Sequence, residues 1–341
     1  MPNSVKITGI DPPYAIPGGE IAIACENYRP ERNSPDGCYI AGIKCRTIGS
    51  SVTRILAIVP DEAGEGKTIA HLESSSEVSN THEMIVGREL ADDMHIVANP
   101  AVDPTDDAII LTRSGSRGQH LPVTLFRLET DGYLDEMPEA ILNPTGIAFD
   151  ADGQMFVTNR AQGEVYAVGR DGTATVYAAG LGIATGLAFD KSGAMYVGDR
   201  SGTIYKVNEY ASAEAFATVE QSVAAYHLAF GPDGRLYVTA PGLASHDAVY
   251  AIDKDGTVTR FFRGLGRPQG LAFDRSGNLY VAGCYQGHHG IVKIAPDDQS
   301  ARHLVAGNSV VGLCFTRTGD MIVATNAAVY SISCGIEGTL L

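Results

Sequence analysis

Apolar strands and polar turns alternate in a repeated order through most of this chain. Five copies of one phrase, the first reading TGIAFDADGQMFVTN (145–159), each place an aromatic residue at the same point of an apolar run. These anchors are spaced by 40, 41, 43 and 42 residues, and they are Phe149, Phe189, Phe230, Phe273 and Phe315. A repeat of about 40–45 residues with several short strands per copy is typical of a β-propeller blade.

Each copy predicts four strands. The first copy starts with the buried run 145–150 and continues, after the turn pair Asp152-Gly153, with the strand Gln154–Thr158. Glycine in such a pair supplies the positive φ that a tight hairpin needs, and Asp or Ser closes the turn. A third strand around Tyr166 and a Thr-rich fourth strand complete the copy. Because a single copy leaves an apolar face exposed, neighbouring copies are expected to stack.

A sixth, degenerate copy precedes these five. Its strands are expected at Ile96–Asp103, Ala108–Thr112 and Val123–Leu128. Six copies over residues 96–341 are predicted to close a ring, which removes the open sheet edges of a linear array. The last copy has a weak fourth strand, and the segment before Ile96 is a candidate to supply it. The sequence leaves this choice open.

Residues 1–88 follow a different pattern. About seven short β-type runs lie between turn-rich joints, which indicates a small β-sandwich. One run alternates strictly, with Ile21, Ile23 and Cys25 on one face. The further strands are expected at Cys38–Ile43, Ile55–Val59, Thr68–Leu72 and His82–Val86. With the acidic segment 89–95 as a linker, the predicted fold is all-β: a sandwich followed by a six-bladed β-propeller.

Both parts resemble known families. The text ITGIDPPYAIPGGEIAIACENY (7–28) and the later SSVTRILAIVPDEAGEGK (50–67) are similar to IPT/TIG immunoglobulin-like domains. The phrase G-[IL]-A-F-D-x-x-G-x-[LM]-[YF]-V resembles NHL-type propellers and, more loosely, the gluconolactonase/senescence-marker and streptogramin-lyase groups. The first resemblance implies a spacer, docking surface or dimer contact. The second implies a fold that serves hydrolases, lyases and binding scaffolds alike.

Composition excludes some partners. Asp and Glu number 40 against 25 Lys and Arg, so the net charge of −15 disfavours nucleic acid. No run of 18 apolar residues predicts a membrane span, and no secretory signal is visible, so a cytoplasmic location is expected. The six cysteines form no CxxC pair and are interpreted as free thiols in a reducing compartment. A disulfide among Cys25, Cys38 and Cys45 is the alternative.

The candidate site is the axial face, where the first strands begin and the loops between second and third strands lie. The positions before the first strands carry no carboxylate, whereas gluconolactonase-type enzymes resemble this ring but hold a divalent cation with Glu, Asp and Asn. That difference argues against lactonase catalysis. The candidate ligand-binding residues on this face are His95, Arg113, Arg117, His120, Thr145, Arg160, Thr185, Arg200, Tyr226, His227, His246, Gln269, Tyr285, His288 and His289.

The histidines and arginines of this set allow several interpretations. The six loop histidines predict either ordinary polar surface, a ligand or partner pocket, or a divalent metal or acid–base site. The arginines either recognise an anionic ligand or pair with Asp199 and Glu164, and ion pairing is the simpler interpretation. No catalytic residue and no metal ligand is assigned from the sequence.

Three functions follow as hypotheses. The first is a recognition or scaffold protein that binds a small molecule or a protein on the propeller face, with the immunoglobulin-like domain for docking. The second is a metal-assisted lactone or ester hydrolase or lyase at the same face, with a divalent metal as the cofactor. The third is an assembly component that forms homo-oligomers through the immunoglobulin-like domain.

Overall fold

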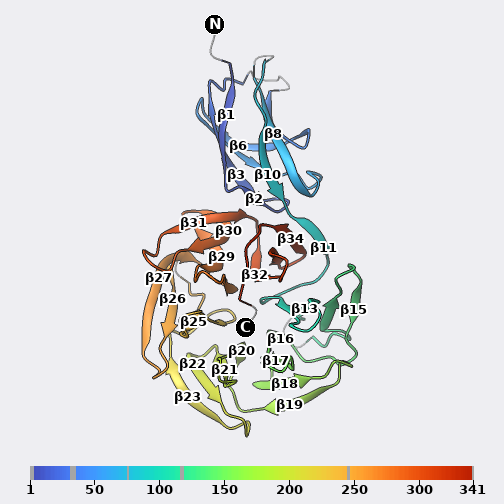
Figure 1. The fold of residues 1–341 in the computed structure, drawn as a ribbon, viewed down its shortest axis with the longest axis vertical. Helices are drawn as coiled ribbons and strands as arrows, with labels where there is room; N and C mark the ends of the chain where they lie inside the picture. The colour runs from blue at the N-terminus through green and yellow to red at the C-terminus, as the bar shows by residue number, and fades with distance from the viewer. Residues whose placement is uncertain (1–3, 31–35, 75–76, 116–118, 244–245, 340–341) are drawn as a thin grey trace.

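The computed structural model describes residues 4–30, 36–74, 77–115, 119–243 and 246–339. These residues form strands, turns and loops and no helix, so the predicted all-β class is confirmed. The described part of the chain accordingly contains no apolar helix of membrane-spanning length. The strands build a smaller N-terminal part and a larger ring, which Figure 1 shows one above the other.

The ring is built from successive antiparallel units of four strands arranged around a common centre (Figure 1). The first three units are β12 (Ala101–Val102), β13 (Ile109–Thr112), β14 (Leu125–Leu128) and β15 (Leu134–Glu136); β16 (Pro144–Phe149), β17 (Met155–Asn159), β18 (Glu164–Val168) and β19 (Ala174–Ala178); and β20 (Ala184–Phe189), β21 (Met195–Asp199), β22 (Thr203–Val207) and β23 (Ala213–Thr218). The next two are β24 (His227–Phe230), β25 (Leu236–Thr239), β26 (Asp247–Ile252) and β27 (Val258–Gly266); and β28 (Leu271–Phe273), β29 (Leu279–Tyr285), β30 (His288–Ile294) and β31 (Ala301–Ala306).

The last unit takes its outer strand from a distant part of the chain. β32 (Val310–Phe315), β33 (Asp320–Thr325) and β34 (Val329–Ser333) pair in sequence order, and β11 (Arg88–Ala91) then pairs antiparallel with β34. The segment before Ile96 therefore supplies this strand, which was one of the two possibilities that the sequence left open. Part of the expected linker 89–95 is thus a strand of the ring.

The hairpin turns follow the predicted chemistry. Gly153 has a φ of 79°, and the corresponding glycines of the later copies have φ values between 80° and 86°. In the turn before β17, the Asp150 carboxylate accepts hydrogen bonds from the amides of Asp152 and Gln154, at 3.0 and 2.9 Å. These contacts stabilise the turn between β16 and β17 locally.

Aromatic side chains join one unit to the next. The aromatic residue on the second strand of a unit packs against the phenylalanine on the first strand of the following unit. The ring centroids lie 4.7–5.2 Å apart at tilted or edge-to-face angles, in the pairs Phe156–Phe189, Tyr196–Phe230, Tyr237–Phe273 and Tyr280–Phe315. The regular spacing of the phenylalanines in the sequence therefore reflects one contact repeated around the ring.

The first strand of the degenerate copy is shorter than predicted. The expected strand 96–103 is wrong in extent, because only Ala101–Val102 forms β12. Pro100 cannot donate a backbone hydrogen bond. The Asn99 side chain instead crosses to later units, where its Nδ2 donates to the Leu271 carbonyl at 2.9 Å and its Oδ1 accepts from the Leu313 amide at 3.0 Å.

The N-terminal part packs two groups of strands face to face. One sheet has the order β1-β3-β7-β6, and the other places β2, β10, β8, β4 and β5 side by side, with β9 on β8. A shared core with Ile21, Ile23, Ile55 and Leu72 lies between them. The bounds are β1 (Lys6–Asp11), β2 (Tyr14–Ala15), β3 (Glu20–Glu26), β4 (Gly37–Ile40), β5 (Ile43–Lys44), β6 (Arg46–Ser50), β7 (Arg54–Ile58), β8 (Gly66–Ser74), β9 (Glu77–Val78) and β10 (His82–Val86).

The two parts share a continuous sheet. β2 pairs parallel with β31 of the ring on one side and with β10 on the other. Ile16, which follows β2, is 1% exposed and packs in the core formed by the last two units of the ring. A hydrogen bond of 3.1 Å between His288 Nδ1 and the Glu20 carboxylate adds a contact across the same junction. The N-terminal part is therefore anchored to the ring by backbone pairing and by burial of an apolar side chain.

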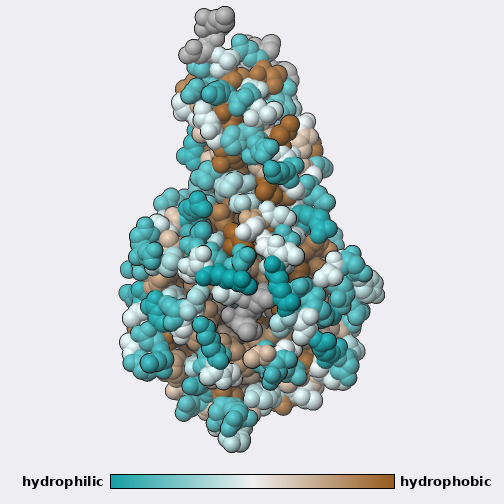
Figure 2. All heavy atoms as spheres, in the orientation of Figure 1, coloured by the Kyte–Doolittle hydropathy of each residue, from teal (hydrophilic) through white to brown (hydrophobic). Residues whose placement is uncertain are grey.

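All six cysteines are free, as the favoured interpretation expected, and no disulfide joins Cys25, Cys38 and Cys45. These three are buried in the N-terminal part. Figure 2 shows hydrophilic residues over most of the visible face of both parts, with hydrophobic residues scattered between them.

Candidate functional site

A pocket of about 950 Å³ opens at the end of the ring where the first strands of the units begin. Each unit contributes to it, either from the segment before its first strand or from the loop between its second and third strands. This is the axial face on which the sequence analysis placed the candidate residues. The lining residues are His95, Ile96, Val97, Arg160, Thr185, Arg200, Val223, Ala224, Ala225, Gly242, Leu243, Gly266, Arg267, Gln269, Gly283, Cys284, His289, Gly290, Ser309, Val310, Val311 and Asn326.

The wall carries basic side chains and, among its described residues, no carboxylate. Arg160, Arg200 and Arg267 contribute guanidinium groups and His95 and His289 contribute imidazoles, whereas no Asp or Glu lies among the lining residues of the described chain. None of the three arginines forms an ion pair with a described carboxylate. A chain with an excess of acidic residues thus carries a local basic pocket.

The nearby carboxylates are engaged elsewhere. Asp199 accepts hydrogen bonds from the amides of Ile183 and Ser201, at 2.9 and 3.0 Å. Glu164 accepts a hydrogen bond of 3.0 Å from the Tyr166 hydroxyl. The expectation that Asp199 and Glu164 pair with the loop arginines is therefore wrong, because these carboxylates bind backbone amides and a hydroxyl group instead.

The backbone holds the arginines in place. The Arg200 amide donates to the Ile183 carbonyl at 3.1 Å, and its carbonyl accepts from the Ser222 amide at 3.1 Å. The Arg267 amide donates to the Asp247 carboxylate at 3.3 Å, and the same oxygen accepts from the Gly242 amide at 3.0 Å. The Asp247 carboxylate therefore holds the two loops that contain Gly242 and Arg267, and both residues line the pocket.

The pKa of the Arg160 guanidinium is lowered by its surroundings. Burial lowers the pKa of its guanidinium, and the positive charge of Arg200 lowers that pKa further. Both effects disfavour the charged form, and an anion placed between the two groups would reverse the second effect. The two guanidinium groups therefore act on one another across the wall.

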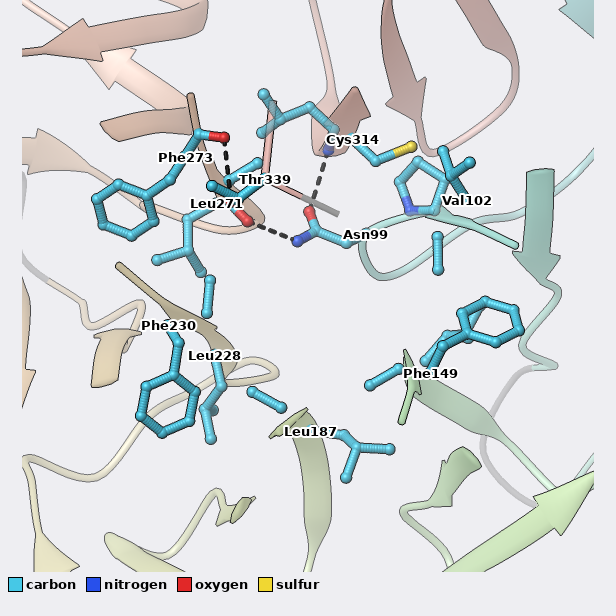
Figure 3. A pocket seen from close by; sticks show the side chains of 18 of the residues that line it. Asn99, Val102, Phe149, Leu187, Leu228, Phe230, Leu271, Phe273, Cys314 and Thr339 are labelled. Carbon is cyan, nitrogen blue, oxygen red and sulfur yellow. Dashed lines mark hydrogen bonds between the residues drawn. The ribbon is translucent and has the colours of Figure 1, made fainter. Parts of the chain in front are cut away.

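The opposite end of the ring has a different character. A small cavity of about 120 Å³ lies there, lined mainly by the apolar ends of the first strands, with Asn99 crossing it (Figure 3). The C-terminal segment lies over this end, where the Thr339 amide donates to the Phe273 carbonyl at 2.9 Å. Phe149, Phe230 and Phe273 point away from the centre in Figure 3. This small cavity, unlike the wide pocket, has no charged side chain among its described lining residues.

Six of the fifteen candidate residues line the wide pocket. These are His95, Arg160, Thr185, Arg200, Gln269 and His289. The sequence analysis missed Arg267, although it lies only two residues before the candidate Gln269, in the segment preceding the first strand of its unit. The same positional argument, extended by two residues, would have identified it.

The other candidates lie elsewhere. Arg113 lies 3.9 Å from the Asp93 carboxylate, and His120 lines a separate small cavity of about 30 Å³. Tyr285 and His288 line a groove at the junction with the N-terminal part. Thr145 and Tyr226 are fully buried, His227 is 4% exposed, and His246 is exposed beyond the pocket wall. Arg117 lies outside the described residues.

His227 occupies the position at which the other four clear copies of the repeat have a glycine. A Cβ at Gly146 would lie 2.6 Å from the Thr185 carbonyl oxygen, and one at Gly270 would lie 2.5 Å from the Cα of Gly312, because first strands approach closely there. The unit with His227 accommodates a full imidazole, and its Nε2 has no hydrogen-bond partner. Burial lowers the pKa of His227 to about 4, so the ring is neutral near pH 7.

The pocket does not provide the ligands of a gluconolactonase-type divalent cation. Hard cations bind carboxylate and carbonyl oxygens, and no carboxylate lies among the described residues of the wall. Among the described residues, no three His, Cys, Asp or Glu side chains gather into a possible metal-binding group. The wall is instead suited to a ligand that guanidinium and apolar groups can contact.

Comparison with solved structures finds the same overall fold at low sequence identity. An auxiliary nutrient binding protein from Bacteroides ovatus is 13% identical with a TM-score of 0.56, covering 97% of this chain and 98% of its own. Virginiamycin B lyase from Staphylococcus aureus is 13% identical with a TM-score of 0.54, covering 89% and 97%. A gluconolactonase from Xanthomonas campestris is 19% identical with a TM-score of 0.50, covering 73% and 87%.

These similarities place the chain among propeller-like proteins by fold. At such identities they carry no activity from one protein to another. No protein-family model and no curated protein matches the sequence.

Proposed function

We propose that this protein is a ligand-binding recognition protein, composed of an IPT/TIG-like immunoglobulin-type sandwich and a six-bladed NHL-type propeller whose axial pocket holds a small molecule. The observation that carries the proposal is the pocket of about 950 Å³, which all units of the ring line. Its size suits a small organic ligand. The Bacteroides ovatus protein, described as an auxiliary nutrient binding protein, is similar over nearly the whole of both chains and supports a binding role.

The arrangement of the two parts supports the same proposal. Their junction is formed by β2, β31 and the buried Ile16, at the edge of the ring, so the pocket is not built from the N-terminal part. The sandwich can therefore serve as a docking or spacing domain while the propeller binds. Such a division suits a recognition protein, and it also leaves open self-association through the sandwich.

A fluorescence experiment tests the proposal. The chain contains no tryptophan, so Val223→Trp places the only indole at the pocket, where Val223 is 47% exposed. Val176→Trp is the matched control, since Val176 is 51% exposed on β19 outside the pocket. Small molecules that raise the melting temperature of the wild type are expected to change the emission of Val223→Trp in a saturable way and not that of Val176→Trp. Equal responses from both variants, or none from either, contradict the proposal.

A metal-assisted hydrolase or lyase is the second candidate. Its support is the presence of His95 and His289 in the pocket wall, together with the fold shared with a lyase and a gluconolactonase. A panel of lactones and esters, assayed with and without added divalent metal, tests it. Turnover that is lost in His289→Ala and kept in His82→Ala, at a partly exposed histidine of β10 outside the pocket, would favour this candidate over simple binding.

A further inference from the structure

The chemistry of the pocket wall defines the kind of ligand that it accepts. Acidic residues outnumber Lys and Arg by 40 to 25 in the chain, yet the described residues of the wall include three arginines and no acidic residue. The guanidinium group of an arginine near a protein surface normally pairs with a carboxylate of its own chain or is hydrated by water. Here the two acidic side chains that lie directly behind the loops, Asp199 and Asp247, each accept hydrogen bonds from two backbone amides on one carboxylate oxygen, and neither forms an ion pair with the three arginines.

This arrangement leaves three guanidinium groups without an ion pair to a described carboxylate, on loops whose backbone is held in place at Arg200 and Arg267. Arg160 and Arg200 are half-buried, and their mutual repulsion is not relieved by a described carboxylate. The Arg200 backbone is held on both sides, and the Arg267 amide is held by Asp247. Guanidinium groups bind carboxylates and phosphates through paired hydrogen bonds, and a backbone that is already held in place lowers the entropic cost of ordering the loops on binding.

The wall also has an apolar portion. Ile96, Val97, Val223, Leu243, Val310 and Val311 line the same pocket. A free inorganic ion would leave these groups without a contact, whereas a carbon skeleton between anionic groups would cover them. The ligand therefore needs both charge and an organic body.

We infer that the axial pocket takes a small organic anion with two or more carboxylate or phosphate groups, held by Arg160, Arg200 and Arg267. This inference rests on the proposed function, because it specifies the ligand class of the same pocket. The anionic groups would neutralise the clustered arginines, and the ligand's carbon atoms would lie against the apolar side chains.

Isothermal titration of the full chain tests the inference with two pairs of probes. Citrate is compared with its uncharged triethyl ester, and glucose 1,6-bisphosphate is compared with glucose, so the two arms separate carboxylate from phosphate recognition. At least one anion is expected to bind with one site per chain, and its neutral partner is not. Binding of the neutral probe as tightly as its anion, or binding of neither anion, overturns the inference.

Single substitutions locate the binding. Arg160→Gln, Arg200→Gln and Arg267→Gln are each expected to weaken binding of the anion by about tenfold or more, since each removes charge-assisted hydrogen bonds. Arg260→Gln is the matched control, because Arg260 is exposed and pairs with Glu220 at 3.0 Å away from the pocket. Should a Gln variant fail to fold, Arg→Lys at that position keeps the charge but loses the paired geometry, and it is expected to weaken binding less.

Two results would separate failure of this inference from failure of the proposed function. Unchanged affinity in all three pocket variants overturns the inference. If Val223→Trp still reports saturable binding of an uncharged molecule, the pocket remains a binding site and only the ligand class is wrong. If no molecule changes that emission selectively, the proposed function fails as well.

Discussion

A single buried imidazole shows how one residue departs from the repeat. His227 stands where Gly146, Gly186, Gly270 and Gly312 stand in other copies, and its Nε2 lacks a hydrogen-bond partner. The position in the repeat could be predicted from the sequence, and with it the place of His227 near the axis. Its burial could not, because the room for an imidazole depends on how far neighbouring first strands separate in that one unit.

Acid is expected to destabilise the protein through His227. Burial lowers its pKa to about 4 in the folded protein, below the ordinary value of 6.5, so the unfolded chain binds the proton more readily. The stabilising contribution of neutral His227 is therefore fully present above pH 6.5 and is lost as the pH drops toward 4, by up to about 3 kcal/mol. Urea denaturation of the wild type and His227→Gln at several pH values measures this. The loss is expected to be smaller in the variant, and parallel profiles would refute the account.

Asp247 is expected to support the pocket from behind. Its carboxylate accepts hydrogen bonds from the amides of Gly242 and Arg267. Asp247→Ala leaves these amides without their partner, which is expected to cost about 1–3 kcal/mol of unfolding free energy. Asp255→Ala is the control, because the exposed Asp255 bonds only within its own turn, to the Thr257 amide. Equal losses in both variants, measured by urea denaturation, would show that Asp247 has no special role.

At the scale of elements, the repeat predicted most inner strands of the ring because one contact recurs there. An aromatic residue on a second strand meets the phenylalanine of the next first strand, as in Tyr280–Phe315. The strand 96–103 was overestimated, since Asn99 bonds to two other units and no local pattern reveals such a partner. The junction through β2 and β31 was likewise invisible, because it joins short segments almost 300 residues apart.

The junction predicts a measurable role for Ile16. Its side chain is 1% exposed and packs in the core of the last two units, although it belongs to the N-terminal part of the chain. Ile16→Ala is expected to lower the unfolding free energy by about 2–5 kcal/mol, as for other buried aliphatic side chains. Ile48→Ala, at an isoleucine that is 52% exposed on β6, is expected to change it by less than about 0.5 kcal/mol. Similar values for both variants would rule out the anchoring role.

At the scale of the whole molecule, the local charge of the axial pocket is opposite in sign to the net charge of the chain. The net charge of −15 pointed away from polyanionic partners such as nucleic acid, yet the axial pocket gathers three arginines without a carboxylate. The sequence analysis placed Arg160 and Arg200 on this face but expected them to pair with Asp199 and Glu164. Whether an ion pair forms depends on the direction in which each carboxylate points. Here the Asp199 carboxylate accepts hydrogen bonds from backbone amides and does not pair with an arginine. The fold class was therefore predictable from periodicity, whereas the availability of the arginines required the structure.

Crystal structures of the full chain grown with citrate and with glucose 1,6-bisphosphate test the central claim most directly. The account predicts at least one of these anions in the axial pocket, with its carboxylates or phosphates within hydrogen-bonding distance of guanidinium groups of Arg160, Arg200 or Arg267. An axial pocket that holds neither anion would contradict it.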